Sequence, residues 1–112
     1  MSVASDLISA LSTTNLPVVQ SQYTGTAATY ITFNYITNPD HFADDSPLYE
    51  KYTIQVHLFA LSTTDTTTLQ GTIKTALETN GYNYPRTIDA SVDKSEQHIV
   101  FETEIEVYIG GS

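Results

Sequence analysis

Apolar and polar residues alternate along three long segments of the chain, residues 29–37, 51–61 and 98–109. Because successive side chains of a β-strand point to opposite faces of a sheet, this alternation predicts three strands, each with one buried face. The residues expected to face the core are Ile31, Phe33, Tyr35, Tyr52, Ile54, Val56, Leu58, Ile99, Phe101, Ile105 and Val107. Apolar faces of this length need another layer of structure to cover them.

Two stretches have the spacing of apolar residues that is typical of amphipathic helices. The first covers residues 2–12, and its apolar stripe consists of Val3, Leu7 and Leu11. The second follows a run of capping residues at 62–65, and its stripe consists of Leu69, Ile73, Ala76 and Leu77. Gly81 suits the left-handed conformation that ends a helix, and Tyr82 is expected to fold back onto the last turn.

Weaker signals predict two short strands at residues 18–23 and 86–92, and the acidic, proline-containing segment 38–47 is predicted to be a loop. The order of elements predicts an α+β fold, a small mostly antiparallel sheet of four to five strands with two helices packed on one face. With 112 residues, the chain is expected to form a single domain, residues 1–112, with a flexible tail at 110–112.

Charge and composition exclude several classes of function. The chain has 4 basic and 13 acidic residues and a formal net charge of -9, whereas a protein that grips nucleic acid needs a basic face. It has no cysteine, so a disulfide framework and a thiolate metal site are both excluded. No signal-peptide pattern and no apolar run of membrane-spanning length is present, and we expect a soluble protein without a membrane partner.

Glu102, Glu104 and Glu106 are the most distinctive charged residues, because their alternation places them on the same face of the last strand. Three unpaired carboxylates in a core would be very unfavourable, so this face is expected to meet water or a wet lumen. From the pattern alone, a plain solvated sheet face is the more common explanation, and a wet lumen is the alternative. A catalytic carboxylate pair would need a pocket that raises one pKa, and no such pocket is predicted.

The three histidines, His41, His57 and His98, do not form a recognised metal-binding motif. His57 and His98 are expected to be cross-strand neighbours on the polar face, either as a loose metal site with Glu102 or, as the pattern favours, as exposed polar partners. The sequence also lacks a phosphate-binding loop and an activated nucleophile. We therefore expect no metal, no cofactor and no enzymatic activity.

Tyrosine is unusually common, with 8 residues, and it is favoured at protein–protein interfaces. Together with the small number of lysines, this favours an extensive interface between subunits. The segment 38–47 is interpreted either as a solvated turn or as a contact surface. The candidate contact residues in it are Asp40, Phe42, Asp44 and Asp45.

Three local patterns resemble one family of virion proteins. They are TYITF at 29–33 followed by Ala-Asp-Asp at 43–45, YTIQVHLF at 52–59, and KTALETNGY at 74–82. In their order, and with the closing hairpin at 88–101, they resemble the tail terminator (tail completion, head–tail joining) proteins of long-tailed, non-contractile bacteriophages. The resemblance covers about residues 23 to 107. His57 stands where that family is expected to carry an acid.

The resemblance implies a virion protein, assembled in the host cytoplasm, that forms a homo-hexameric ring on the end of the tail tube. Such a ring stops polymerisation of the tube protein, presents a surface to the head connector or completion protein, and lets DNA pass without specific binding. On this interpretation, Glu102, Glu104 and Glu106 are lumen or inter-subunit residues. The candidate axial contacts are Asp40, Phe42, Asp44 and Asp45. The alternatives are another head–tail connector or stopper, a minor tail component, or an unrelated acidic protein-binding domain.

Overall fold

The computed structural model describes residues 2–43 and 46–109, and their side chains except those of residues 41–47. The elements are α1 (Val3–Leu11), a 3-10 turn η1 (Ser12–Thr14), β1 (Val18–Gln20), β2 (Tyr30–Ala43), β3 (Ser46–Leu61), α2 (Thr67–Thr79), β4 (Arg86–Asp89) and β5 (Glu96–Tyr108). The five strands form one sheet in the order β1-β2-β3-β5-β4. Only β1 and β2 are parallel; the other neighbours are antiparallel.

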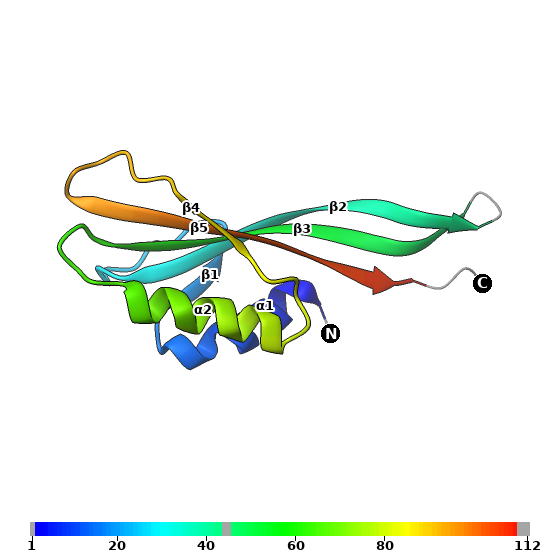
Figure 1. The fold of residues 1–112 in the computed structure, drawn as a ribbon, viewed down its shortest axis with the longest axis horizontal. Coiled ribbons are helices and arrows are strands. Elements are labelled where there is room, and N and C mark those ends of the chain that lie inside the picture. The colour runs from blue at the N-terminus through cyan, green and yellow to red at the C-terminus, as the bar shows by residue number, and fades with distance from the viewer. Residues whose placement is uncertain (1, 44–45, 110–112) are drawn as a thin grey trace.

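Both helices lie on the same face of the sheet, as Figure 1 shows. The core fills the space between this face and the helices, and its fully buried large side chains are Leu7, Leu11, Ile31, Phe33, Ile54, Val56, Leu58, Ile73, Leu77 and Phe101. Full burial of one such side chain is worth about 1.5–3 kcal/mol, so this layer accounts for most of the favourable packing. The predicted α+β fold is confirmed.

The predicted start of α1 and the predicted end of α2 are present, whereas the helix start expected at 62–65 is not: α2 begins at Thr67, and its N-cap residue Thr66 makes no side-chain cap bond. The hydroxyl of Ser2 accepts a hydrogen bond from the backbone N–H of Ser5 at 3.1 Å and caps α1. Gly81 has φ of +94° after the end of α2, and the N–H of Tyr82 donates to the carbonyl of Leu77 at 3.0 Å. Tyr82 is buried against the core, as expected for a chain that folds back onto the helix. Neither described helix is long and apolar enough to cross a membrane.

The prediction of a loop over residues 38–47 is wrong, because β2 continues to Ala43 and β3 begins at Ser46. The reason lies in the position of β2 in the sheet. The N–H of Ile31 and the carbonyl of Phe33 bond to the segment that carries β1, so odd-numbered residues of β2 direct their backbone groups toward that outer edge. Pro39 has the same parity, so its missing N–H faces the edge and interrupts no ladder bond.

The lengthened hairpin gives the molecule an elongated shape, with principal extents of 54 × 25 × 25 Å. In Figure 1, β2, β3 and the end of β5 project well beyond the two helices. We call this three-stranded projection the arm and define it as residues 37–43, 46–52 and 105–108. The predicted tail at 110–112 lies outside the described residues.

Candidate functional site

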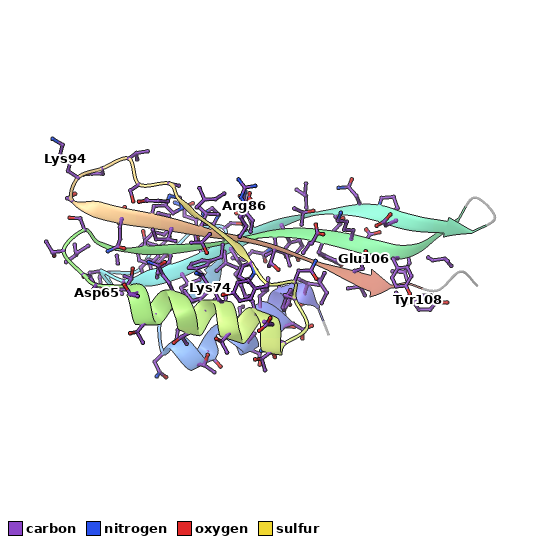
Figure 2. All side chains as sticks on the ribbon, viewed as in Figure 1. Asp65, Lys74, Arg86, Lys94, Glu106 and Tyr108 are labelled. Carbon is purple, nitrogen blue, oxygen red and sulfur yellow. The ribbon has the colours of Figure 1, made fainter. Side chains whose placement is uncertain are left out.

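The side of the sheet opposite the helices carries most of the predicted site residues. In the register of β3 and β5, Glu102 lies opposite Gln55, Glu104 opposite Thr53, and Glu106 opposite Lys51. The three glutamates therefore project from one face, away from the core. Figure 2 shows Arg86 on this side of the sheet as well, with Glu106 and Tyr108 following along the end of β5.

Cations accompany two of these carboxylates. The ammonium of Lys51 lies 3.4 Å from a carboxylate oxygen of Glu104, and Nε of Arg86 lies 4.0 Å from one of Glu102. Both pairs are partly exposed, and each is expected to contribute at most about 1 kcal/mol to stability. They also change the surface potential, because 2 of the chain's 4 basic residues lie beside this acidic strand and offset part of its negative charge. The face is therefore acidic but not uniformly so.

The structure brings His57 and His98 into contact, with Nδ1 of His57 2.8 Å from Nε2 of His98. Nε2 of His57 lies 2.7 Å from Oδ1 of Asn34 on β2. Burial lowers the pKa of both histidines; the nearby His98 lowers that of His57 further, whereas Glu96 and Asp89 oppose the lowering at His98. No group of three potential metal ligands occurs among the described residues.

A row of stacked rings crosses this face beside the histidines, and we did not predict it from the sequence. The ring centroids are 4.3 Å apart for Tyr23 and Tyr30, 5.0 Å for Tyr30 and Phe59, and 4.2 Å for Phe59 and His98. The register explains it, since Tyr30, Phe59 and His98 are opposite one another on β2, β3 and β5. The signal in the sequence was Phe59, an apolar residue at a polar-face position.

The predicted axial contacts lie along the arm. Asp40 is in β2 opposite Tyr49, and Phe42 is in β2 opposite Pro47, so both belong to a strand and not to a loop. The other two, Asp44 and Asp45, lie outside the described residues. Because Tyr49 also faces Tyr108 with ring centroids 5.3 Å apart, Asp40 occupies the same face as the three glutamates. Asp40 and the three glutamates are thus parts of one surface.

The arm also exposes large apolar side chains. Ile36 at its base and Tyr108 at the end of β5 are 62% and 63% exposed, and Val107 and Ile109 are also exposed. Small soluble monomers rarely gather such residues at one end without a partner. An exposed apolar end combined with an acidic face favours an interaction surface over a catalytic pocket.

Both edges of the arm are open within the described parts of the chain. On one side, β1 pairs only with residues 31–33 of β2. On the other side, β4 pairs only with residues 99–102 of β5. The segment between α2 and β4 extends this contact slightly, because the backbone N–H of Asn83 donates to the Glu104 carbonyl at 3.1 Å. Beyond these points no described strand lies on the outer side of β2 or of β5, the side away from β3. Open edges present rows of backbone groups that favour pairing with another strand.

Two grooves in the described part of the structure do not add a recognisable reaction centre. A groove of about 560 Å³ between the helices is lined by small side chains, including Ala10, Gly71 and Thr75. A second groove, about 320 Å³, lies beside β5 and is lined in part by Tyr84, Arg86 and Glu102. The second groove borders the acidic face and is lined by both partners of the Arg86–Glu102 pair.

Comparison with known proteins defines the fold only. No family model matches the chain, and no curated protein sequence is similar to it. A solved protein chain is similar in structure over 99% of this chain and 100% of its own length, with a TM-score of 0.59 and 12% sequence identity. At this identity the likeness establishes a shared fold and carries no information about function.

Proposed function

We propose that the protein is a structural assembly protein of a long-tailed bacteriophage, a tail terminator that forms a homo-hexameric ring on the end of the tail tube. Its role is to stop tube polymerisation and to provide the surface to which the head connector attaches. The observation that carries the proposal is the arm, with its two open edges on opposite sides of the same sheet. The resemblance of the segments at 29–33, 52–59 and 74–82 to tail terminators supplies the family.

The open edges favour a head-to-tail contact between copies. The edge of β2 in one subunit can pair with the edge of β5 in the next, because the two edges are different surfaces and do not compete. A contact between two different surfaces is heterologous, and it produces a closed ring when the rotation between subunits closes. Such pairing would also cover Ile36 and Tyr108, which are exposed in the single subunit.

The acidic face suits a channel for DNA. Glu102, Glu104 and Glu106 repeated around a ring would present carboxylates to the phosphate backbone, and a repulsive wall allows DNA to pass without sticking. Lys51 and Arg86 lower the strength of that repulsion at Glu104 and Glu102. We assign the face to the lumen or to the contact between subunits, and we assign Asp40 and Phe42 to axial contacts with tube or connector.

The experiment that tests this function is deletion of the gene in the phage, followed by electron microscopy of lysates. We expect overlong tails without heads, because tube polymerisation would lack its stop. Restoring the gene on a plasmid should return tails to normal length. Tails of normal length in the deletion strain would refute the terminator role. If they also lacked heads, a connector or stopper would be the better assignment.

The open edges also suit a second class, an acidic domain that binds an extended peptide by adding it as a strand. Such a domain would remain monomeric, and its deletion would leave both tail length and head attachment unchanged.

A further inference from the structure

A continuous line of polar contacts crosses the sheet on the face opposite the helices. It begins with Arg86 beside Glu102, and the amide nitrogen of Gln55 donates to the other carboxylate oxygen of Glu102 at 3.3 Å. The amide nitrogen of Asn34 then lies 3.5 Å from the amide oxygen of Gln55. The line ends with the contacts of Asn34 to His57 and of His57 to His98. It connects β4, β5, β3 and β2.

The chemistry of this line fixes the position of each proton. A carboxylate only accepts, so Gln55 must present its NH₂ to Glu102 and its oxygen to Asn34. Asn34 therefore donates through its nitrogen, and its oxygen must accept from Nε2–H of His57. With its proton on Nε2, a neutral His57 has a lone pair on Nδ1. His98 must then donate from its own Nε2–H across the 2.8 Å contact.

We propose that His57 and His98 act together as a proton-responsive junction on the face of the sheet opposite the helices. The junction accepts one proton without loss of the contact, because a charged His98 still donates from Nε2 to His57. It breaks when a second proton arrives, because protonated His57 carries N–H groups at both ring nitrogens. Two donors then face each other across the gap, and the side-chain bond between His57 and His98 is lost, while the backbone pairing of β3 with β5 remains.

The surrounding charges set the order of these two steps. The charged groups that act on His98 are Glu96 on β5 and Asp89 on β4. Farther along the same face are Glu102, which contacts Arg86 and Gln55, and Tyr30, which stacks on Phe59. Glu96 and Asp89 act on His98 and favour its charged form, whereas His57 faces burial and the charge of His98. His98 therefore takes the first proton and His57 the second. Interacting groups of this kind titrate in two separated steps.

The position of the junction determines what it controls. Asn34 is the first residue of β2 beyond the part that pairs with β1, and His57 lies diagonally across from it on β3. Loss of the contact would loosen β3 against β5 beside the core residues Val56, Leu58 and Ile99, and would add positive charge to the acidic face. The junction is argued from this single subunit, so it does not depend on the proposed assembly role.

The test is a histidine titration of the full chain by ¹H–¹⁵N NMR, in a His41→Gln background that leaves only two imidazoles to observe. We expect both rings in the Nε2–H form at pH 8, and two steps in which His98 titrates before His57 as the pH falls. Independent titrations of both rings near the ordinary value of about 6.5 would overturn the proposal. An Nδ1–H form of His57 at pH 8 would also overturn it.

A matched variant separates the junction from general stability. His98→Gln places an amide donor at the position of Nε2–H and removes one titrating group. The fold should be retained, with His57 titrating in a single step and still as the Nε2–H form. If His57 in this variant kept a two-step curve, the coupling would have another source, and the pairing with His98 would be refuted.

A second measurement follows the unfolding equilibrium in urea between pH 7.5 and pH 5. Since the pKa values are lowered in the folded state, the unfolded chain binds more protons, and stability falls as the pH drops below about 6.5. The unfolding constant should rise about tenfold for each unit by which a folded pKa lies below the unfolded value. The His57→Asn, His98→Gln double variant should lose most of this dependence. An unchanged dependence in the double variant would contradict the proposal.

Discussion

At the scale of single residues, two glycines in and after α2 have opposite effects on stability. Gly81 follows the helix with φ of +94°, a left-handed conformation that residues with a Cβ atom adopt only at a cost. Gly71 lies on the exposed side of the helix interior, and a Cβ built there would meet no atom within 4 Å. The same substitution should therefore have opposite effects at the two positions.

We predict that Gly81→Ala destabilises the protein by about 1–2 kcal/mol, because alanine is strained in the left-handed region. Gly71→Ala should stabilise it by about 0.5–1 kcal/mol, because alanine restricts the unfolded chain and favours the helix. Urea denaturation of both variants at pH 7.5 provides the measurement. If the free energy of unfolding changed in the same direction in both variants, the placement of Gly71 inside α2 and of Gly81 after its end would be contradicted.

Single residues also explain why the histidine junction could not be derived fully from the sequence. The alternation of strands placed His57 and His98 on the polar face and made their contact a reasonable expectation. The link to Asn34 depends on the register of β2 against β3, which brings Asn34 to Gln55 and His57, residues that are 21 and 23 positions away in the chain. Register over such distances is fixed by packing of the whole sheet, and local sequence patterns do not contain it.

At the scale of elements, the core was predictable and the arm was not. Period-two alternation identified most of the buried residues of β2, β3 and β5, because one face of each strand meets the helices. Val107 is the exception: it was expected to face the core and is exposed in the arm, beyond the helices. The segment 38–47 was assigned to a loop because proline and acidic residues usually interrupt strands. Pro39 is accommodated because β2 is an edge strand at that point, and edge position is a property of the assembled sheet.

The edge of β2 offers a direct test of pairing between subunits. Thr37 is exposed and has the same outward backbone parity as Pro39, so proline is expected to fit there without breaking the bonds to β3. We predict that Thr37→Pro folds normally but fails to form rings, because it removes an N–H from the open edge. Analytical ultracentrifugation with tail tubes present measures the outcome.

Thr37→Val is the matched control, since it keeps the N–H and the extended backbone. Rings of the same stability in both variants would mean that this edge does not pair with another subunit. Circular dichroism at several urea concentrations checks that both variants are folded.

The acidic strand β5 should matter for assembly or DNA passage and little for folding. We predict that the triple change Glu102→Lys, Glu104→Lys and Glu106→Lys leaves the fold intact, because these side chains lie outside the core. Ring formation or DNA passage should fall sharply, since reversed charges attract phosphate and repel Lys51 and Arg86. Phage titre and DNA ejection measure the effect.

The neutral triple change to glutamine serves as the control for the charge reversal and should give a smaller defect. Full infectivity of the lysine variant would identify the face as ordinary solvated surface.

At the scale of the whole molecule, the domain has two dissimilar ends. One end is a helix-covered sheet with a continuous core, and the other is the uncovered arm, which projects beyond the helices in Figure 1. The helix-covered end stabilises the single subunit. The arm contributes little to that stability, because it exposes apolar side chains and open strand edges. The arm is best explained by contacts that form only in an assembly.

The mass of the species that forms on tail tubes is the most direct test of the ring. Purified protein is incubated with tail tubes, the tubes are washed, and the released complex is weighed by native mass spectrometry. We predict a closed assembly of six copies, each of 12.3 kDa, that forms with wild-type protein and is lost with Thr37→Pro. Protein that stays monomeric in the presence of tubes, or that fails to bind them, would contradict the proposed function.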